Sequence, residues 1–198
     1  MRKVELVIDE DNLIDGYEAL SVVDLPAIEE NFVALSRNAN RYVFSKLKEG
    51  FLIGPALVPN KDILRVDQET GEEFEVFFTP ETVKKVAYQM MSKFAQKRFT
   101  ADHESKAQGL TIVESWIIED EKNDKSKKYG FKLKPGTWMV KVAVDNDKVR
   151  QRIENGELKG FSIEAFFTEK ALNFNKLEEV NDIVTELKNT QQLLNDVL

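Results

Sequence analysis

Hydrophobic and polar positions alternate in short segments along most of the chain. Phe74, Val76 and Phe78 lie on one side of such a segment, with charged residues between them, which is the two-residue period of a half-buried strand. Other short apolar runs predict strands over 3–8, 17–24, 32–35, 42–44, 51–59, 99–104, 110–119, 137–144 and 161–167. The pattern therefore indicates a chain rich in short, consecutive strands.

One longer segment has the helical period instead. Over 80–97 the apolar residues recur at spacings of three and four, as Val83, Val86, Ala87, Met90, Met91 and Phe94. Thr79 is a good N-cap, Pro80 suits the first helical position, and both methionines are interpreted as core residues. A shorter helix is predicted over 147–155, ended by Gly156.

These elements predict an α+β fold with a mostly antiparallel, barrel-like sheet flanked by helices, because helical patterns rarely separate the strands. Residues 1–170 are expected to form this domain. The segment 171–198 has a different pattern from the rest of the chain, because from Leu177 onward apolar residues recur at helical spacing among acids and amides. This amphipathic segment is expected either to pack on the domain or to pair with a partner, which makes a homo-oligomer one of the expected assemblies.

Composition narrows the classes of function. A length of 198 residues suits one domain, and a formal charge of −7 argues against a general nucleic-acid-binding surface. The absence of Cys excludes disulfides and thiolate chemistry, and a single His argues against a zinc site, so neither a metal nor a cofactor is expected. Without a long apolar run or a signal-peptide pattern, we expect no membrane partner and a cytoplasmic location.

Two segments about sixty residues apart carry candidate chemistry. His103, the only histidine, lies in 99–104, and Ser162 follows Gly160 in an apolar run. Serine hydrolases need an imidazole to take the serine proton and pass it to the leaving amine. A lone histidine is nevertheless more often a surface or core residue, and a serine within a hydrophobic strand is more often structural. The pair alone does not decide the function.

A carboxylate that orients the imidazole would complete a triad. If a tight turn centres on 108–109, His103 lies opposite Glu114 on one face of a hairpin, where the carboxylate could accept the Nδ1 hydrogen. A loop one residue different in length would bring Val113 or Ser115 there instead. Alternation also places Glu164 on the same face as Ser162, so Glu164 is a rival for this role.

Several sequence blocks then follow one another in a recognisable order. They are IVESW at 112–116, GTWMVKV at 136–142 and GELKGFSIE at 156–164, preceded by ALSVVDLPAI at 19–28 and GPALVP at 54–59. In this order, over residues 17–168, they resemble the prohead maturation proteases of tailed phages, and more closely their phage serine protease subgroup. The resemblance implies a serine endopeptidase that cleaves scaffold and major capsid proteins inside the assembling procapsid, in the host cytoplasm.

The resemblance also implies a fold similar to the herpesvirus assembly protease, with His103 as general base and Ser162 as nucleophile. Other prohead proteases carry an acid just before a segment that follows the serine. Here the similar segment precedes the histidine, Ala19 occupies the acid position, and Glu18 lies one residue away. Glu114, Glu18 and Glu164 therefore remain candidates for the third member, and either a Ser-His dyad or a Ser-His-Glu triad is expected.

Two other functions remain open. A non-catalytic capsid-assembly or scaffold protein could retain the protease fold, and an unrelated α+β binding module would follow if the sequence blocks matched by coincidence. The retention of both His103 and Ser162 favours the enzyme over the non-catalytic protein.

Overall fold

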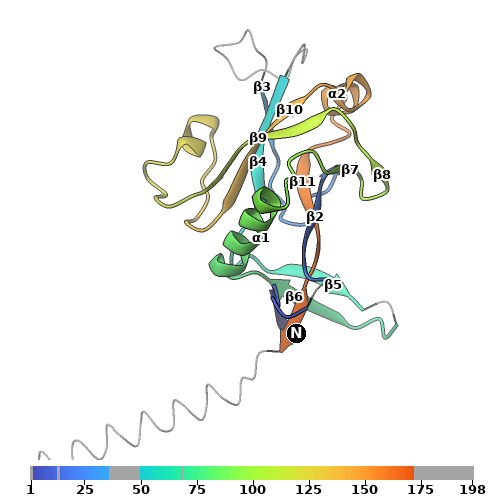
Figure 1. The fold of residues 1–198 in the computed structure, drawn as a ribbon, viewed down its shortest axis with the longest axis vertical. Coiled ribbons are helices and arrows are strands. Elements are labelled where there is room, and N and C mark those ends of the chain that lie inside the picture. The colour runs from blue at the N-terminus through green and yellow to red at the C-terminus, as the bar shows by residue number, and fades with distance from the viewer. Residues whose placement is uncertain (1, 13, 36–49, 68, 172–198) are drawn as a thin grey trace, which may run out of the picture.

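The computed structural model describes residues 2–12, 14–35, 50–67 and 69–171. These residues form two α-helices, a 3₁₀-helix and twelve strands that pair as three four-stranded sheets (Figure 1). The strands are β1 (Arg2–Val7), β2 (Gly16–Val23), β3 (Val33–Leu35), β4 (Gly50–Leu57), β5 (Ile63–Val66), β6 (Glu73–Phe77), β7 (Phe99–Ala101), β8 (Ser105–Lys106), β9 (Leu110–Ile117), β10 (Trp138–Val144), β11 (Gly160–Phe166) and β12 (Thr168–Ala171). The helices are α1 (Pro80–Ser92), α2 (Asp147–Glu154) and η1 (Lys125–Tyr129).

The three sheets have the strand orders β12-β1-β6-β5, β3-β4-β10-β9 and β11-β2-β7-β8. All strand pairs are antiparallel except β1 with β6 and β2 with β7. The α+β class and the mostly antiparallel pairing are therefore confirmed. The barrel-like sheet is wrong, because the described strands divide into three sheets and close no barrel.

Aromatic side chains join the sheets into one core. Tyr17 of β2 and Trp138 of β10 are fully buried and meet edge to face, with ring centroids 6.0 Å apart. Phe161 of β11 is also fully buried and packs on Phe32, at a centroid distance of 5.1 Å. The strand that carries the candidate serine is thus anchored in the core directly beside that residue.

Helix α1 ends at Ser92, five residues before its predicted end. Phe94 has a φ of +51°, and the Ala95 N–H donates to the Met90 carbonyl, which is a Schellman ending with Phe94 in the position that glycine usually occupies. Met90 is fully buried as predicted, whereas Met91 is half exposed, so its assignment to the core is wrong. Phe94, the last residue of the apolar stripe, is 86% exposed. The early ending leaves 93–98 as the connection to β7.

Helix α2 agrees closely with its prediction. Asn146 caps it by accepting a hydrogen bond from the Val149 N–H, and Gly156 follows its C-terminus with a φ of +73°. The predicted strand over 42–44, the predicted helix from residue 177 and the boundary between 1–170 and 171–198 lie outside the described residues or at their edge. In the part of the chain that the structure describes, no helix is long and apolar enough to cross a membrane.

Candidate active site

A row of polar side chains crosses the sheet β11-β2-β7-β8. Ser162 of β11 lies opposite Ser21 of β2, Ser21 is in register with Thr100 of β7, and Thr100 is in register with Lys106 of β8. Neighbouring strands are about 4.8 Å apart, and residues in register share a face of the sheet. One face of this sheet therefore carries the hydroxyl residues Ser162, Ser21 and Thr100 side by side on three strands.

The start of β11 is fixed by a close backbone contact. A Cβ at Gly160 would lie 2.5 Å from Pro26 Cγ and 2.7 Å from Pro26 Cβ, so no larger side chain fits there. Gly160 also forms an isolated bridge with Asn31. A glycine within a strand often marks such a close approach of another segment, and the contact holds the strand two residues before Ser162.

The histidine lies in the tight turn between β7 and β8. Asp102 and His103 have φ values of +51° and +60°, and the Glu104 N–H donates to the Ala101 carbonyl at 3.0 Å. Positive φ at both central residues is the signature of a type I′ turn, and Asp and His accept the left-handed region more readily than most residues. The turn directs His103 back toward the neighbouring strands.

Two hydrogen bonds hold His103 on residues that adjoin Ser162. Its backbone N–H donates to Ser21 Oγ at 3.1 Å, and Ser21 is the residue opposite Ser162. Its ring Nδ1 lies 3.0 Å from Glu164 Oε1, and Glu164 is two residues after Ser162 on the same strand. Thr100 Oγ1 also donates to Glu164 Oε1, which fixes the carboxylate from a third strand.

This arrangement leaves the other ring nitrogen of His103 available. With Nδ1 on Glu164, Nε2 is the atom that can take a proton from a nucleophile. The His103 side chain is 43% exposed, and that of Glu164 is 28% exposed, so the pair is open to a substrate. Among the described side-chain hydrogen bonds none joins Ser162 Oγ to the His103 ring. The nucleophile–base contact is thus not formed in this structure.

The predicted hairpin that opposed His103 and Glu114 is wrong. Strand β7 pairs with the short β8 after a turn at 102–104, whereas β9 pairs with β10 in another sheet and places Glu114 opposite Lys141. The two left-handed residues close the hairpin several residues before Gly109, where the turn was expected. Glu114 therefore makes its contacts away from the histidine.

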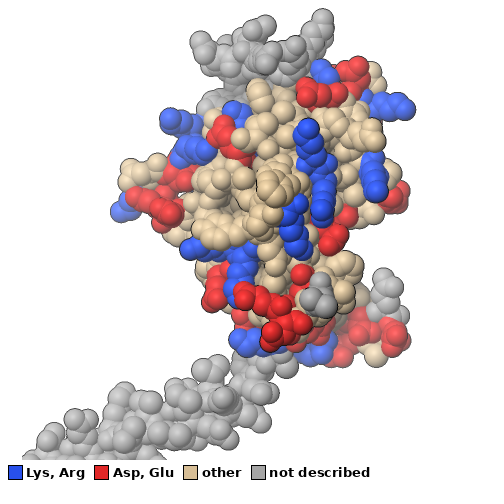
Figure 2. Space-filling model, viewed as in Figure 1, with Lys and Arg blue, Asp and Glu red and all other residues tan. Residues whose placement is uncertain are grey.

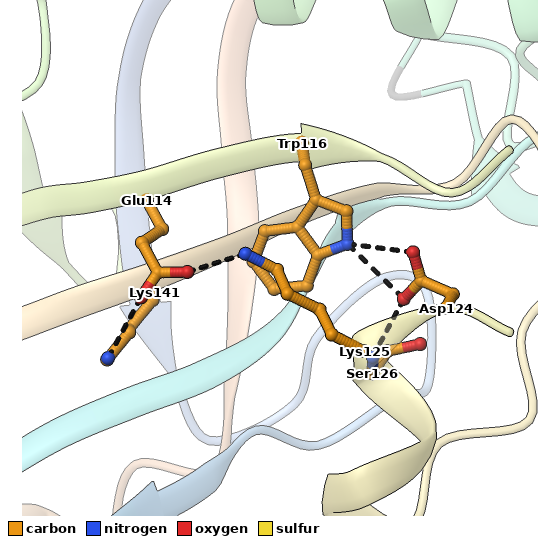
Figure 3. Close-up of polar contacts among 6 residues, drawn as sticks. All are labelled: Glu114, Trp116, Asp124, Lys125, Ser126 and Lys141. Carbon is orange, nitrogen blue, oxygen red and sulfur yellow. Dashed lines mark hydrogen bonds and ion pairs between the residues drawn. The ribbon is translucent and has the colours of Figure 1, made fainter.

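Figure 3 shows the surroundings of Glu114. Its carboxylate accepts from Lys125 at 2.5 Å and from Lys141 at 2.9 Å, and hydrogen bonds from these two lysines lower its pKa. Lys125 Nζ also lies 3.8 Å from the centre of the Trp116 ring, whose Nε1 donates to Asp124. The cluster ties the 3₁₀-helix η1 to β9, which is a structural role.

Glu18, the other candidate, lies at a bulge in β2. Glu164 pairs with Ala19 and Ala165 pairs with Tyr17, so Glu18 has no partner residue on β11. It is exposed and lines the same cleft as Glu164, but no hydrogen bond between Glu18 and His103 is found among the described residues. Of the three candidate carboxylates, Glu164 is the one in contact with the imidazole.

Two hollows flank β11. A cleft of about 500 Å³ lies beside Glu164 and Thr100, and its other lining residues are Glu18, Ala19, Lys97, Arg98, Phe99, Lys106, Ala107 and Gln108. A smaller, mainly apolar pocket of about 230 Å³ is bordered by Ser162 and by side chains that include Ile63, Phe78 and Ile163. Within the described ranges no group of three or more His, Asp or Glu side chains is arranged to hold a metal ion.

Sequence reasoning missed Ser21 and Thr100. Each is a hydroxyl residue within a predicted strand, which is the same signal that drew attention to Ser162. Only the pairing of β2 with both β11 and β7 shows that the three hydroxyl residues form one row.

A comparison of the sequence with known protein families finds a match. The family model described as "Putative phage serine protease XkdF" matches residues 64–170. The chain belongs to this family of phage serine proteases. The matched segment includes His103, Glu114, Ser162 and Glu164, whereas Glu18 and Ser21 precede it. No curated protein and no solved structure gives a significant match to the chain.

Proposed function

We propose that this member of the phage serine protease family is an endopeptidase with Ser162 as nucleophile, His103 as general base and Glu164 as the carboxylate that orients the imidazole. One observation carries the proposal. The His103 ring is hydrogen-bonded to Glu164, two residues beyond Ser162 on the same strand. The His103 backbone N–H donates to Ser21, the residue opposite Ser162 on the neighbouring strand. Both anchors of the only histidine are thus immediate neighbours of the candidate nucleophile.

The chemistry follows from these positions. Ser162 Oγ attacks the carbonyl carbon of a peptide bond as its proton passes to His103 Nε2, and Glu164 stabilises the imidazolium that forms. The C–N bond then breaks, and the imidazolium gives its proton to the leaving amine. Water, activated by the same imidazole, hydrolyses the acyl-enzyme and restores Ser162. The nucleophilic step requires Ser162 Oγ to come within about 3 Å of Nε2, a contact that often tightens only when substrate is bound.

We further propose that the substrates are the scaffold and major capsid proteins, cleaved inside the procapsid in the host cytoplasm. Support comes from the phage family and from the sequence blocks shared with prohead proteases. A fold related to the herpesvirus assembly protease, self-association as a homo-oligomer, and independence of nucleic acid, membrane and cofactor belong to the same proposal.

Co-expression with the cognate scaffold and capsid proteins tests the proposal. Ser162→Ala and His103→Ala should each abolish processing, measured as the masses of the product chains. Ser105→Ala, which removes an exposed hydroxyl from β8, is the matched control and should leave processing intact. Normal processing by Ser162→Ala would end the serine-protease proposal. Binding of the scaffold without cleavage by the wild-type chain would instead favour the non-catalytic assembly protein.

A further inference from the structure

The cleft beside Glu164 is lined by three basic and two acidic side chains, so it is positively charged on a chain whose net charge is negative. We infer that it binds an acidic side chain of the peptide substrate, close to the bond that is cut. The inference rests on the proposed protease function for its biological meaning. The binding of acidic peptide that it requires can be measured without cleavage.

The cleft is lined by residues of β2, β7, β8 and β11 and of the segment before β7. Thr100 lies in the middle of β7 and lines the cleft. Arg98 directly precedes β7, and its carbonyl accepts from the Leu20 N–H at 3.0 Å, which holds it beside β2. Lys106 is in register with Thr100 across the β7–β8 pair, so its side chain joins the same face. Glu164 meets this face through its hydrogen bond from Thr100. Lys106 in β8 and Arg98 directly before β7 are thus held by the strand pair whose turn carries His103.

Three cations line the cleft, namely Lys97, Arg98 and Lys106, all of them exposed. None of the three forms an ion pair with a carboxylate of the described residues. Figure 2 shows blue Lys and Arg atoms in a vertical line to the right of the position that α1 occupies in Figure 1. A group of free cations on a chain of formal charge −7 is a local feature that attracts anions.

The cleft also contains two carboxylates, Glu18 and Glu164. Glu164 already accepts one hydrogen bond from Thr100 and is hydrogen-bonded to the His103 ring, so its carboxylate is not free to pair with a lysine or arginine of the cleft. The three cations outnumber the two carboxylates, and only Glu18 competes with a ligand for them. A hydrogen bond from a cation to a carboxylate is among the stronger interactions available to a peptide side chain.

The position of the cleft sets where the acidic residue lies in the substrate. Glu164 is two residues from Ser162 along β11, which corresponds to about 7 Å. An extended peptide advances about 3.3 Å per residue, so a side chain in the cleft belongs to a residue about two positions from the scissile bond. A volume of about 500 Å³ accommodates a glutamate or aspartate side chain with part of its backbone.

A binding experiment on Ser162→Ala, which cannot cleave the peptide, tests the inference. Fluorescent peptides capped at both ends carry Glu or Gln at the two positions on each side of a candidate cleavage site, so that only side chains supply carboxylates. We expect the Glu peptide to bind about tenfold more tightly at low salt, as one charge-assisted hydrogen bond would give. The difference should shrink as added salt screens the charges.

Charge variants locate the effect. In the Ser162→Ala background, Lys106→Gln and Arg98→Gln should each reduce the preference for Glu over Gln, and Lys106→Glu should abolish it. Lys132→Glu, an exposed lysine outside the cleft, is the control and should leave the preference unchanged. The glutamine variants remain informative if a charge reversal fails to fold, because they only remove a charge.

The two proposals fail separately. Equal binding of the Glu and Gln peptides, or a preference that survives both glutamine variants, would overturn the acidic subsite while leaving the protease assignment intact. Identical processing by wild type and Ser162→Ala would overturn the protease assignment, yet a preference for Glu that depends on Lys106 and Arg98 would still demonstrate the acidic site.

Discussion

His103 Nδ1 lies 3.0 Å from Glu164 Oε1, although 61 residues separate them in the sequence. The contact joins the turn between β7 and β8 to β11, across the intervening strand β2. It leaves the other ring nitrogen, Nε2, clear of Glu164, which is the geometry that the proposed catalytic role of His103 requires.

Replacing Glu164 by Gln should lower the rate of peptide cleavage by about 10²–10⁴-fold, because an amide neither enforces the correct tautomer nor stabilises the imidazolium. The matched change Glu114→Gln should leave the rate nearly unaltered, since Glu114 contacts two lysines in another sheet. The kcat of both variants on one peptide substrate checks this expectation. A large loss with Glu114→Gln and none with Glu164→Gln would reverse the assignment.

The nucleophile and base should act as one unit. Ser162→Ala and His103→Ala should each remove nearly all cleavage, and the double variant should be little worse than either, because a base without its nucleophile contributes almost nothing. Single-turnover rates of the three variants provide the measurement. Multiplicative losses in the double variant would show that the two side chains work independently.

Arg152 of α2 should be a positioning residue for the histidine. It donates to Asp102 Oδ2 at 2.6 Å and to Glu157 at 3.2 Å, and Asp102 immediately precedes His103 in the strained turn. Arg152→Met should lower kcat with little change in KM, while Arg152→Lys restores part of the rate. Lys148→Met, an exposed change on the same helix, serves as the control. A rise in KM at constant kcat would contradict a role in placing the imidazole.

Glu114 should contribute stability that depends on pH. Hydrogen bonds from Lys125 and Lys141 lower its pKa in the folded state, so its contribution is present above the unfolded-state pKa and disappears as the pH falls through the folded-state value. Because its side chain is 40% exposed, the contribution at neutral pH should be no more than about 1 kcal/mol. Urea unfolding of wild type and Glu114→Gln between about pH 7 and about pH 3 measures it.

The two unfolding curves should differ at neutral pH, with wild type the more stable, and converge in acid. A gap that widens as the pH falls would show that the ion pairs of Glu114 do not stabilise the fold.

Local patterns in the sequence determined much of this protein. The two-residue period predicted most strand segments, the cap and apolar spacing predicted α1, and Gly156 marked the end of α2. The unique His103 together with Ser162 marked the candidate chemistry. These features depend on residues close together in the chain, where side-chain direction and backbone preference act directly. The relation to phage proteases was also readable from the order of short blocks, and the family match bears it out.

Tertiary structure decided the features that depend on how distant segments pair. Whether Glu164 or Glu114 contacts His103 depends on where the chain turns after β7. The left-handed residues Asp102 and His103 place this turn several residues before the predicted position at 108–109. A shift in register exchanges every partner along a strand, so no local pattern could predict which carboxylate meets the imidazole. The same holds for Phe94, whose place in the apolar stripe suggested burial, while the backbone ending of α1 turns it to solvent.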